Sequence, residues 1–220
     1  TFSSRNPEET HISSLDTAFL AEDNNRRFTR RINRFVIRIP LFHLSDRHRF
    51  PAGRGAAHMA LKHLIIGNGI AGISAIESIR RLDAEASITL IAGESRRPYC
   101  RPMISNLLAG SALSNQLRIR PDDFYERMGV SVAAGEYAEA IDTETKTVIT
   151  GRGNIYEFDR LLIASGADPR PIKADGLELG NIFFMRTQEH VEAILDALPQ
   201  AARALVLGGG LVGFKAAYGL

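Results

Sequence analysis

Two glycine-rich turns in this chain carry the spacing G-x-G-x-x-G, a pattern that can bind the pyrophosphate of a dinucleotide. The first turn is residues 67–72 (GNGIAG), after an apolar run at 61–66, and the second is residues 208–213 (GGGLVG), after an apolar run at 204–207. The first two glycines let the backbone turn tightly and approach a pyrophosphate, and the third lets the following helix pack on the strand. The helix N-terminus then offers free N–H groups to the anion.

A single G-x-G-x-x-G is a weak signal, because three glycines at this spacing also occur in ordinary tight connections of α/β proteins. Both copies here stand between an expected strand and an expected helix, which favours the dinucleotide interpretation. The second copy has less support, because the sequence stops at Leu220 and offers no later strand to check it. Two such sites in one chain suit an enzyme in which one dinucleotide passes electrons to another.

Composition and charge are those of an ordinary globular protein. The chain has 220 residues, of which 45% are hydrophobic, and a formal net charge of +2. Residues 1–58 hold ten arginines, no lysine and six acidic residues, so the positive charge belongs to this segment and gives no support for a nucleic-acid site elsewhere. No apolar run approaches the roughly 20 residues of a membrane helix. Cys100 is the only cysteine, which excludes an intrachain disulfide and favours a reducing, cytoplasmic compartment.

Residues 1–58 differ from the rest of the chain, because they show no sustained helical or strand periodicity. Three interpretations are open: a leader-like extension, a disordered tail that binds an acidic partner, or sequence upstream of a natural start at Met59. The acidic residues fit a targeting peptide poorly. We therefore expect upstream sequence first and a disordered extension second, with the folded domain beginning at Met59.

From residue 61 the hydrophobic pattern becomes regular and predicts a βαβ unit. Residues 61–66 are an expected strand, residues 71–82 an expected helix, and residues 87–92 (SITLIA) a second strand. This unit has the length of about 30 residues that the dinucleotide fingerprint requires. The buried face of the helix is expected to carry Ile70, Ile73, Ile76, Ile79 and Leu82.

Shorter elements are expected further along the chain. Prolines at 102 and 121 mark expected helix starts, the first of a short helix at 102–109. Further strands are expected at 130–133, 137–141, 146–150 and 155–164, with a hairpin turn at 151–154, and a helix at 188–198 carries Val191, Ile194, Leu195 and Leu198 on one face. The fold class is α/β: a Rossmann-like parallel sheet with helices on both faces, a small antiparallel β insertion, and the opening of a second dinucleotide-binding domain.

Four segments in a fixed order resemble one family. They are the first glycine turn, residues 99–103 (YCRPM), residues 158–166 (FDRLLIASG) and the second glycine turn. Together they resemble the FAD-dependent pyridine nucleotide-disulfide oxidoreductase superfamily, most closely its branch of rubredoxin reductase, nitrite reductase large subunit and NADH oxidase. The resemblance covers residues 59–220. It implies that 59–200 are the first segment of an FAD-binding domain and that 201–220 are the beginning of an NAD(P)-binding domain, truncated near its start.

The resemblance implies that the first glycine turn binds FAD. Gly67, Gly69, Ala71 and Gly72 would lie beside the pyrophosphate of this cofactor. Glu94 would accept hydrogen bonds from the adenosine ribose, although it stands two residues beyond the family's usual acidic position, and a solvated loop acid is the alternative.

Other segments of the chain would contact the rest of FAD. Arg101 and Pro102 resemble a basic residue–Pro pair that the family places against the isoalloxazine ring, where a cation favours the anionic reduced flavin. The backbone of Ala138 matches the position that meets the adenine. A small-residue segment would close over the cofactor: Ala164, Ser165 and Gly166.

The second glycine turn would bind NAD(P)H through Gly208, Gly210 and Gly213, but Lys215 stands where the family usually has Glu. Cys100 is expected to be a passive, partly buried thiol. The reactive cysteine of related disulfide reductases aligns with the neighbouring proline, and Cys100 has no partner thiol. The six histidines show no spacing typical of metal ligands.

The resulting expectation is an FAD-dependent oxidoreductase that takes hydride from NAD(P)H and passes electrons to a small redox protein or a small-molecule acceptor. A non-catalytic FAD-binding electron-transfer module and a flavin monooxygenase-like enzyme are the alternatives. A homodimer of the full-length protein is an open option, and no nucleic-acid or membrane partner is expected. Residues 1–220 alone are expected to be inactive.

Overall fold

The computed structural model describes residues 20–22, 28–32, 35–39, 60–170 and 172–220. The chain divides into two units, one formed by residues 1–58 with 138–158 and the other by residues 59–137 with 159–220. The first is the smaller unit and the second the larger unit. The larger unit contains both glycine turns.

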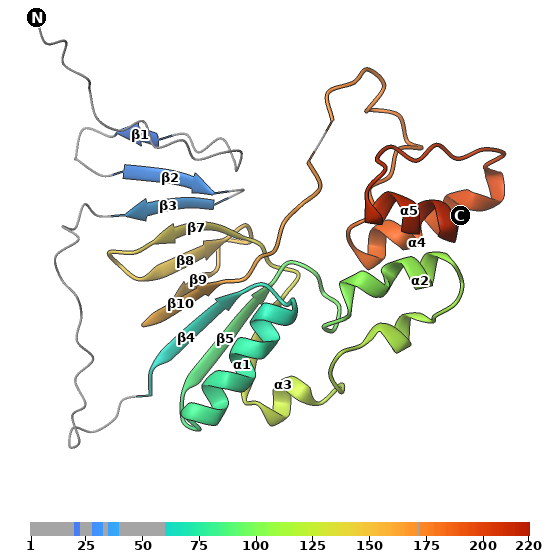
Figure 1. Cartoon of the computed structure of the whole chain (residues 1–220). Coiled ribbons are helices and arrows are strands. Elements are labelled where there is room, and N and C mark those ends of the chain that lie inside the picture. Colours follow the sequence, from blue (N-terminus) through green and yellow to red (C-terminus); the bar gives the residue numbers. More distant parts are fainter. Residues whose placement is uncertain (1–19, 23–27, 33–34, 40–59, 171) are drawn as a thin grey trace, which may run out of the picture. The chain divides into compact units, whose positions relative to one another are not determined.

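A four-stranded parallel sheet forms the centre of the larger unit, as the sequence predicts (Figure 1). Its strands lie in the order β10-β4-β5-β6, with the bounds β4 Lys62–Ile66, β5 Ser87–Ala92, β6 Val130–Ala134 and β10 Arg160–Ile163. The middle strands β4 and β5 bury aliphatic side chains, among them Leu64, Ile65, Leu90 and Ile91. Continuous apolar runs of this kind are typical of a parallel strand that is covered on both faces.

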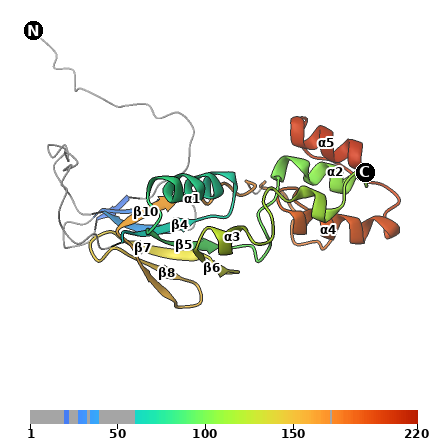
Figure 2. The same cartoon turned by 90° about the horizontal axis from the view of Figure 1, so that it is seen from below.

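Helix α1 (Ile70–Leu82) lies along this sheet, and its middle contributes to the core (Figures 1 and 2). Ile73 and Ile76 are fully buried, whereas Ile70 and Leu82 are 62% and 85% exposed. The prediction that all five aliphatic residues share one buried face is therefore wrong at the two ends. Each step of three residues falls about 60° short of a full turn, so a strict three-residue spacing moves around the helix.

A second hydrophobic cluster joins α2 (Ile104–Leu108), α4 (Gln188–Ala197) and α5 (Leu211–Gly219), which lie together in both views (Figures 1 and 2). On the helix at 188–198 the predicted face is confirmed, because Val191 is buried and Ile194, Leu195 and Leu198 pack against the same cluster. The elements are η1 Arg101–Met103, α2 Ile104–Leu108, η2 Ser114–Leu117, α3 Phe124–Arg127, α4 Gln188–Ala197, η3 Leu198–Gln200 and α5 Leu211–Gly219.

The smaller unit contains the predicted antiparallel insertion, made of β7 Ala138–Asp142, β8 Thr147–Thr150 and β9 Ile155–Glu157. The hairpin turn at 151–154 is confirmed. The N–H of Gly153 donates to the Thr150 carbonyl at 2.8 Å, and the N–H of Thr150 donates to the Asn154 carbonyl at 3.0 Å.

Three further strands extend the sheet of the smaller unit, namely β1 Leu20–Glu22, β2 Phe28–Ile32 and β3 Phe35–Ile39. Strand β3 pairs in parallel with β7. The sequence of residues 1–58 predicts no regular structure, and these strands differ from that expectation. All three are short, and β2 and β3 mix arginines with apolar residues, so they carry no clear period of two. The expected start at Met59 lies outside the described residues.

The predictions for two of the expected strands, residues 155–164 and 204–207, are wrong. Residues 155–164 form two strands, because the N–H of Phe158 donates to Lys146 in one sheet and the N–H of Asp159 donates to Lys62 in the other. Residues 204–207 form no strand, since no described strand pairs with them. An apolar run becomes a strand only when a neighbouring strand takes its backbone hydrogen bonds.

Candidate functional site

The first glycine turn connects β4 to α1. Two of its glycines leave no room for a side chain, and the glycine between them does. The N–H of Gly67 donates to the Ile91 carbonyl at 2.9 Å, which ties the turn to β5. Gly67 has φ +114°, and a Cβ there would collide with the Ala164 carbonyl oxygen. A Cβ on Gly72 would collide with the carbonyl oxygen of Gly67. A Cβ on Gly69 would meet no described atom within 4 Å, so this position leaves room for a ligand.

The N-terminus of α1 is arranged to bind an anion. Gly69 is its N-cap in an extended conformation, and within the described residues no side chain caps the helix and its first turn holds no acid. The first N–H groups of a helix have no partner inside the helix and carry partial positive charge. Ala71 is exposed in this first turn and adds only a methyl group. These features fit a pyrophosphate.

The second glycine turn repeats the backbone geometry of the first. Gly208 has φ +112°, Gly210 is the extended N-cap of α5, and a Cβ on Gly213 would collide with the Gly208 carbonyl oxygen. The two turns differ in their surroundings, because a Cβ on Gly208 would meet nothing within 4 Å. The two turns therefore share a local backbone conformation, but among the described residues only the first packs against another segment at its first glycine.

The segment 164–166 lies against the first turn. The N–H of Ala164 donates to the Ile66 carbonyl at 2.7 Å, which places this backbone beside Gly67. Gly166 has φ +73°, so the chain bends there in a conformation that favours glycine. The structure thus brings together two of the motifs that the resemblance assigns to FAD. Ala138 is buried in β7 of the smaller unit.

Glu94, Tyr99 and Arg101 form a cluster in the loop after β5. The Tyr99 hydroxyl donates to Glu94 Oε2 at 2.7 Å and accepts from Arg101 Nη1 at 3.0 Å and from the Gln188 N–H at 3.1 Å. Arg101 Nη2 donates to Glu94 Oε1, and the guanidinium carbon lies 5.1 Å from the centre of the Tyr99 ring. Burial and the Glu94 hydrogen bond raise the pKa of Tyr99 to about 12.

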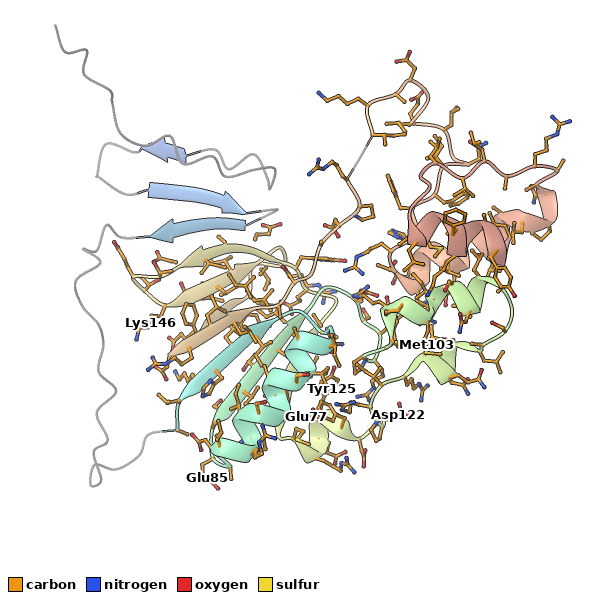
Figure 3. All side chains as sticks on the ribbon, in the orientation of Figure 1. Glu77, Glu85, Met103, Asp122, Tyr125 and Lys146 are labelled. Carbon is orange, nitrogen blue, oxygen red and sulfur yellow. The ribbon has the colours of Figure 1, made fainter. Side chains whose placement is uncertain are left out.

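Asn68, inside the first glycine turn, links that turn to its neighbours. Its Nδ2 donates to the Arg96 carbonyl at 3.2 Å, and its Oδ1 accepts from the hydroxyl of Tyr125, labelled in Figure 3. Burial raises the pKa of Tyr125 to about 12. The sequence does not predict the roles of Asn68, Tyr125 or Gln188, because their contacts join residues far apart in the chain. Tyr99 contacts Glu94 and Arg101, which lie near it in the chain, but no residue pattern in the loop marks these contacts.

Cys100 and Lys215, which the sequence singled out, both lie at the loop that carries Arg101. Cys100 is partly exposed, and its N–H donates to the Leu117 carbonyl at 2.8 Å. Lys215 Nζ donates to the Pro102 carbonyl at 3.4 Å, so this cation of α5 reaches the loop that carries Arg101.

Within the described residues no group of three or more His, Cys, Asp or Glu side chains could hold a metal ion. No helix in that part of the chain is long and apolar enough to cross a membrane.

The parallel sheet and the glycine turn at the N-terminus of α1 define a dinucleotide-binding α/β protein. Residues 61–220 match the family model described as pyridine nucleotide-disulphide oxidoreductase, so the chain belongs to that family. The family uses FAD and NAD(P)H.

Several known proteins are similar to this chain. The ferredoxin reductase subunit of 5,5'-dehydrodivanillate O-demethylase from Sphingobium sp. is 34% identical over 155 residues, which are 70% of this chain and 38% of that protein. Rubredoxin-NAD(+) reductase of Pseudomonas putida is 30% identical, over 70% of this chain and 40% of that protein. NADH:rubredoxin oxidoreductase from Clostridium acetobutylicum superposes with a TM-score of 0.66 at 29% identity, over 73% of this chain and 41% of that chain. The chain thus spans about two fifths of these relatives' length.

Proposed function

We propose that this chain is the FAD-binding part of a reductase that takes electrons from NAD(P)H and passes them to a small redox protein. The observation that carries the proposal is the pair of glycine turns, residues 67–72 and 208–213, which have matching backbone geometry. One dinucleotide site would serve FAD and the other NAD(P)H. Membership of the family supports this division.

The residues of the first turn would hold the FAD pyrophosphate. Gly69 leaves space for it, and the uncapped start of α1, including Ala71, would supply N–H groups. Ala164, Ser165 and Gly166 would close over the same region, since the backbone of Ala164 and Ser165 lies against Gly67. When bound, FAD accepts hydride and releases electrons singly or in pairs. The protein would orient the cofactor and adjust its potential, with Arg101 and Pro102 beside the isoalloxazine ring.

A small redox protein is the favoured electron acceptor, because several relatives are reductases of such proteins. They include ferredoxin and rubredoxin reductases, and one similar structure is a covalent complex of putidaredoxin reductase with putidaredoxin, with a TM-score of 0.65 at 30% identity. A small-molecule acceptor is the second candidate. It is supported by the nitrite reductase [NAD(P)H] of Bacillus subtilis, which is 34% identical over 74% of this chain and 20% of that protein.

Anaerobic reduction tests the proposal. The full-length protein that contains this chain is loaded with FAD and titrated with NADH and with NADPH while flavin absorbance is followed, and oxidised ferredoxin or rubredoxin is then added. We expect the flavin absorbance to bleach with one of the nicotinamides and to return when the redox protein is added. No bleaching with either nicotinamide would indicate a non-catalytic FAD module. Bleaching without recovery would redirect the search to small-molecule acceptors.

A further inference from the structure

Arg96 contacts the first glycine turn with its backbone and helix α4 with its side chain. Its carbonyl accepts a hydrogen bond from Asn68 Nδ2 at 3.2 Å. Its Nη2 pairs with Glu192 Oε2 at 2.5 Å, and its Nε lies 4.0 Å from Glu189 Oε1. The side chains of Arg96 and Glu192 are 35% and 38% exposed, so the pair is partly shielded from solvent. One residue of the loop after β5 therefore joins two segments that are far apart in the chain.

The side-chain amide of Asn68 is held at both of its polar atoms. Its Oδ1 accepts from the hydroxyl of Tyr125, which is buried in the core of the larger unit, and its Nδ2 donates to the Arg96 carbonyl. Asn68 stands between Gly67 and Gly69, so these two bonds restrain the backbone that leads into the first N–H groups of α1. A site that binds an anion through such N–H groups gains affinity when they are oriented before the ligand arrives.

The side chain of Arg96 is attached to a helix that is itself anchored. Glu192 Oε1 accepts from Gln188 Nε2 at 3.1 Å, and the same Nε2 donates to Ser114 Oγ. Gln188 is buried, and its N–H donates to the Tyr99 hydroxyl at 3.1 Å. Helix α4 also shares a hydrophobic cluster with α2 and α5, and α5 begins at the second glycine turn. Arg96 thereby connects the first turn to the group of helices that contains the second.

We propose that Arg96 is a positioning residue that couples binding of a dinucleotide at the first glycine turn to the docking of α4. The inference rests on the proposed function in one respect, namely that the first turn binds the pyrophosphate of FAD. When α4 is docked, Glu192 holds Arg96, and the Arg96 carbonyl together with Tyr125 holds Asn68. Because a coupling free energy acts in both directions, bound FAD stabilises the docked α4 to the same extent.

Two variants distinguish this coupling from a direct contact between the Arg96 guanidinium and FAD. Arg96→Met removes the guanidinium and keeps the carbonyl that accepts from Asn68, and both explanations predict that it weakens FAD binding. The explanations predict opposite results for Glu192→Gln. If Arg96 bound the FAD phosphates directly, loss of a neighbouring negative charge would leave the affinity for this anion unchanged or increase it. If Arg96 acts through α4, the same substitution decreases the affinity, because a neutral partner holds the guanidinium less strongly.

The Kd for FAD is measured on the full-length apoprotein that contains this chain, by the change in flavin fluorescence. We expect Arg96→Met and Glu192→Gln each to raise the Kd about three- to tenfold, within the range of couplings carried by such contacts. The double variant should raise it no further than the weaker-binding single variant. Glu189→Gln is the control matched in charge, because the Glu189 side chain is 62% exposed, and it should leave the Kd within about twofold. An unchanged or lower Kd in Glu192→Gln would overturn the proposal.

Hydrogen exchange of the backbone amides of α4 tests the reciprocal effect. In the parent protein, saturating FAD should slow exchange in residues 188–197, and this difference should disappear in Arg96→Met saturated with FAD. A purely structural role of Arg96 would speed exchange equally with and without FAD and keep the difference, which would overturn the proposal. Exchange in α4 of the parent protein that does not respond to bound FAD would overturn it as well. Failure of the parent protein to bind FAD at all would instead contradict the proposed function.

Discussion

At the scale of single residues, the glycines of the two turns differ in why they must be glycine. Gly67 and Gly72 are required by backbone atoms that a Cβ would strike, whereas Gly69 touches nothing described within 4 Å. A glycine that is required by packing protects the fold. A glycine that borders open space at an uncapped helix N-terminus points to a ligand. Substitutions at these positions should therefore separate folding from binding.

Gly69→Val should abolish FAD binding and leave the fold intact. The new side chain would occupy the space in front of the α1 N-terminus without meeting protein atoms. Flavin content after saturation with FAD and the melting temperature of the apoprotein are the two measurements. Gly180→Val is the matched control, because a Cβ on Gly180 also meets nothing within 4 Å and lies outside the turn. Unchanged flavin content in Gly69→Val would contradict the assignment of the first turn to FAD.

Gly67→Ala should destabilise the protein more than Gly208→Ala. Both glycines have almost the same φ, so the backbone strain of an alanine is similar, of order 1–3 kcal/mol. Only at Gly67 does the Cβ also collide with the Ala164 backbone. Urea unfolding of the two variants measures the difference. Equal losses in the free energy of unfolding would mean that the contact with Ala164 is relieved without cost.

Tyr99 and Tyr125 should make the protein sensitive to alkali. Burial raises the pKa of each hydroxyl to about 12, against about 10 in the unfolded chain. The folded state then holds protons that the unfolded state has lost, so the free energy of unfolding should fall from about pH 10 to about pH 12. Unfolding by urea at several pH values measures this slope. Tyr99→Phe should make it shallower, whereas the exposed Tyr137→Phe should leave it unchanged.

At the scale of secondary structure, the sequence predicted those elements that are determined by their own residues. The β4-α1-β5 unit, the hairpin turn and the apolar face of α4 follow from periodicity and glycine placement, and the structure confirms them. The break at Phe158 and the missing strand at 204–207 depend on which backbone partners other segments offer. A pattern within one segment holds no information on those partners. For the same reason the sequence could not predict that Tyr99 is anchored on Gln188, which lies 89 residues away in the chain.

Removal of residues 1–58 tests whether β1, β2 and β3 support the fold. We expect a protein that begins at Met59 to bind FAD and to melt within a few degrees of the longer chain. The strands β7, β8 and β9 retain their own antiparallel ladder, and Ile141 and Val148 are buried in it. Thermal unfolding and flavin content of both chains provide the comparison. A large drop in melting temperature would show that pairing of β3 with β7 contributes to stability.

At the scale of the whole chain, the second glycine turn has its local geometry, but no described strand pairs with the residues before it. Residues 204–207 have no strand partner among the described residues, and Leu205 and Leu207 are 85% and 72% exposed. Helix α5 also exposes apolar side chains, including Leu211, Val212, Phe214 and Tyr218. Apolar surface of this extent favours association with other apolar surface.

Residues 1–220 alone should therefore bind FAD weakly, associate with each other and show no steady oxidation of NADH. A nicotinamide site on a parallel sheet needs strands beside the glycine turn, and the described chain offers none next to residues 204–207. Light scattering after size-exclusion chromatography measures association, and the absorbance of NADH in the presence of FAD measures turnover. Replacing Leu205 and Leu207 by Ser should reduce association without creating activity. Steady NADH oxidation by the purified chain, free of any partner, would show that Gly208, Gly210 and Gly213 already form a working nicotinamide site.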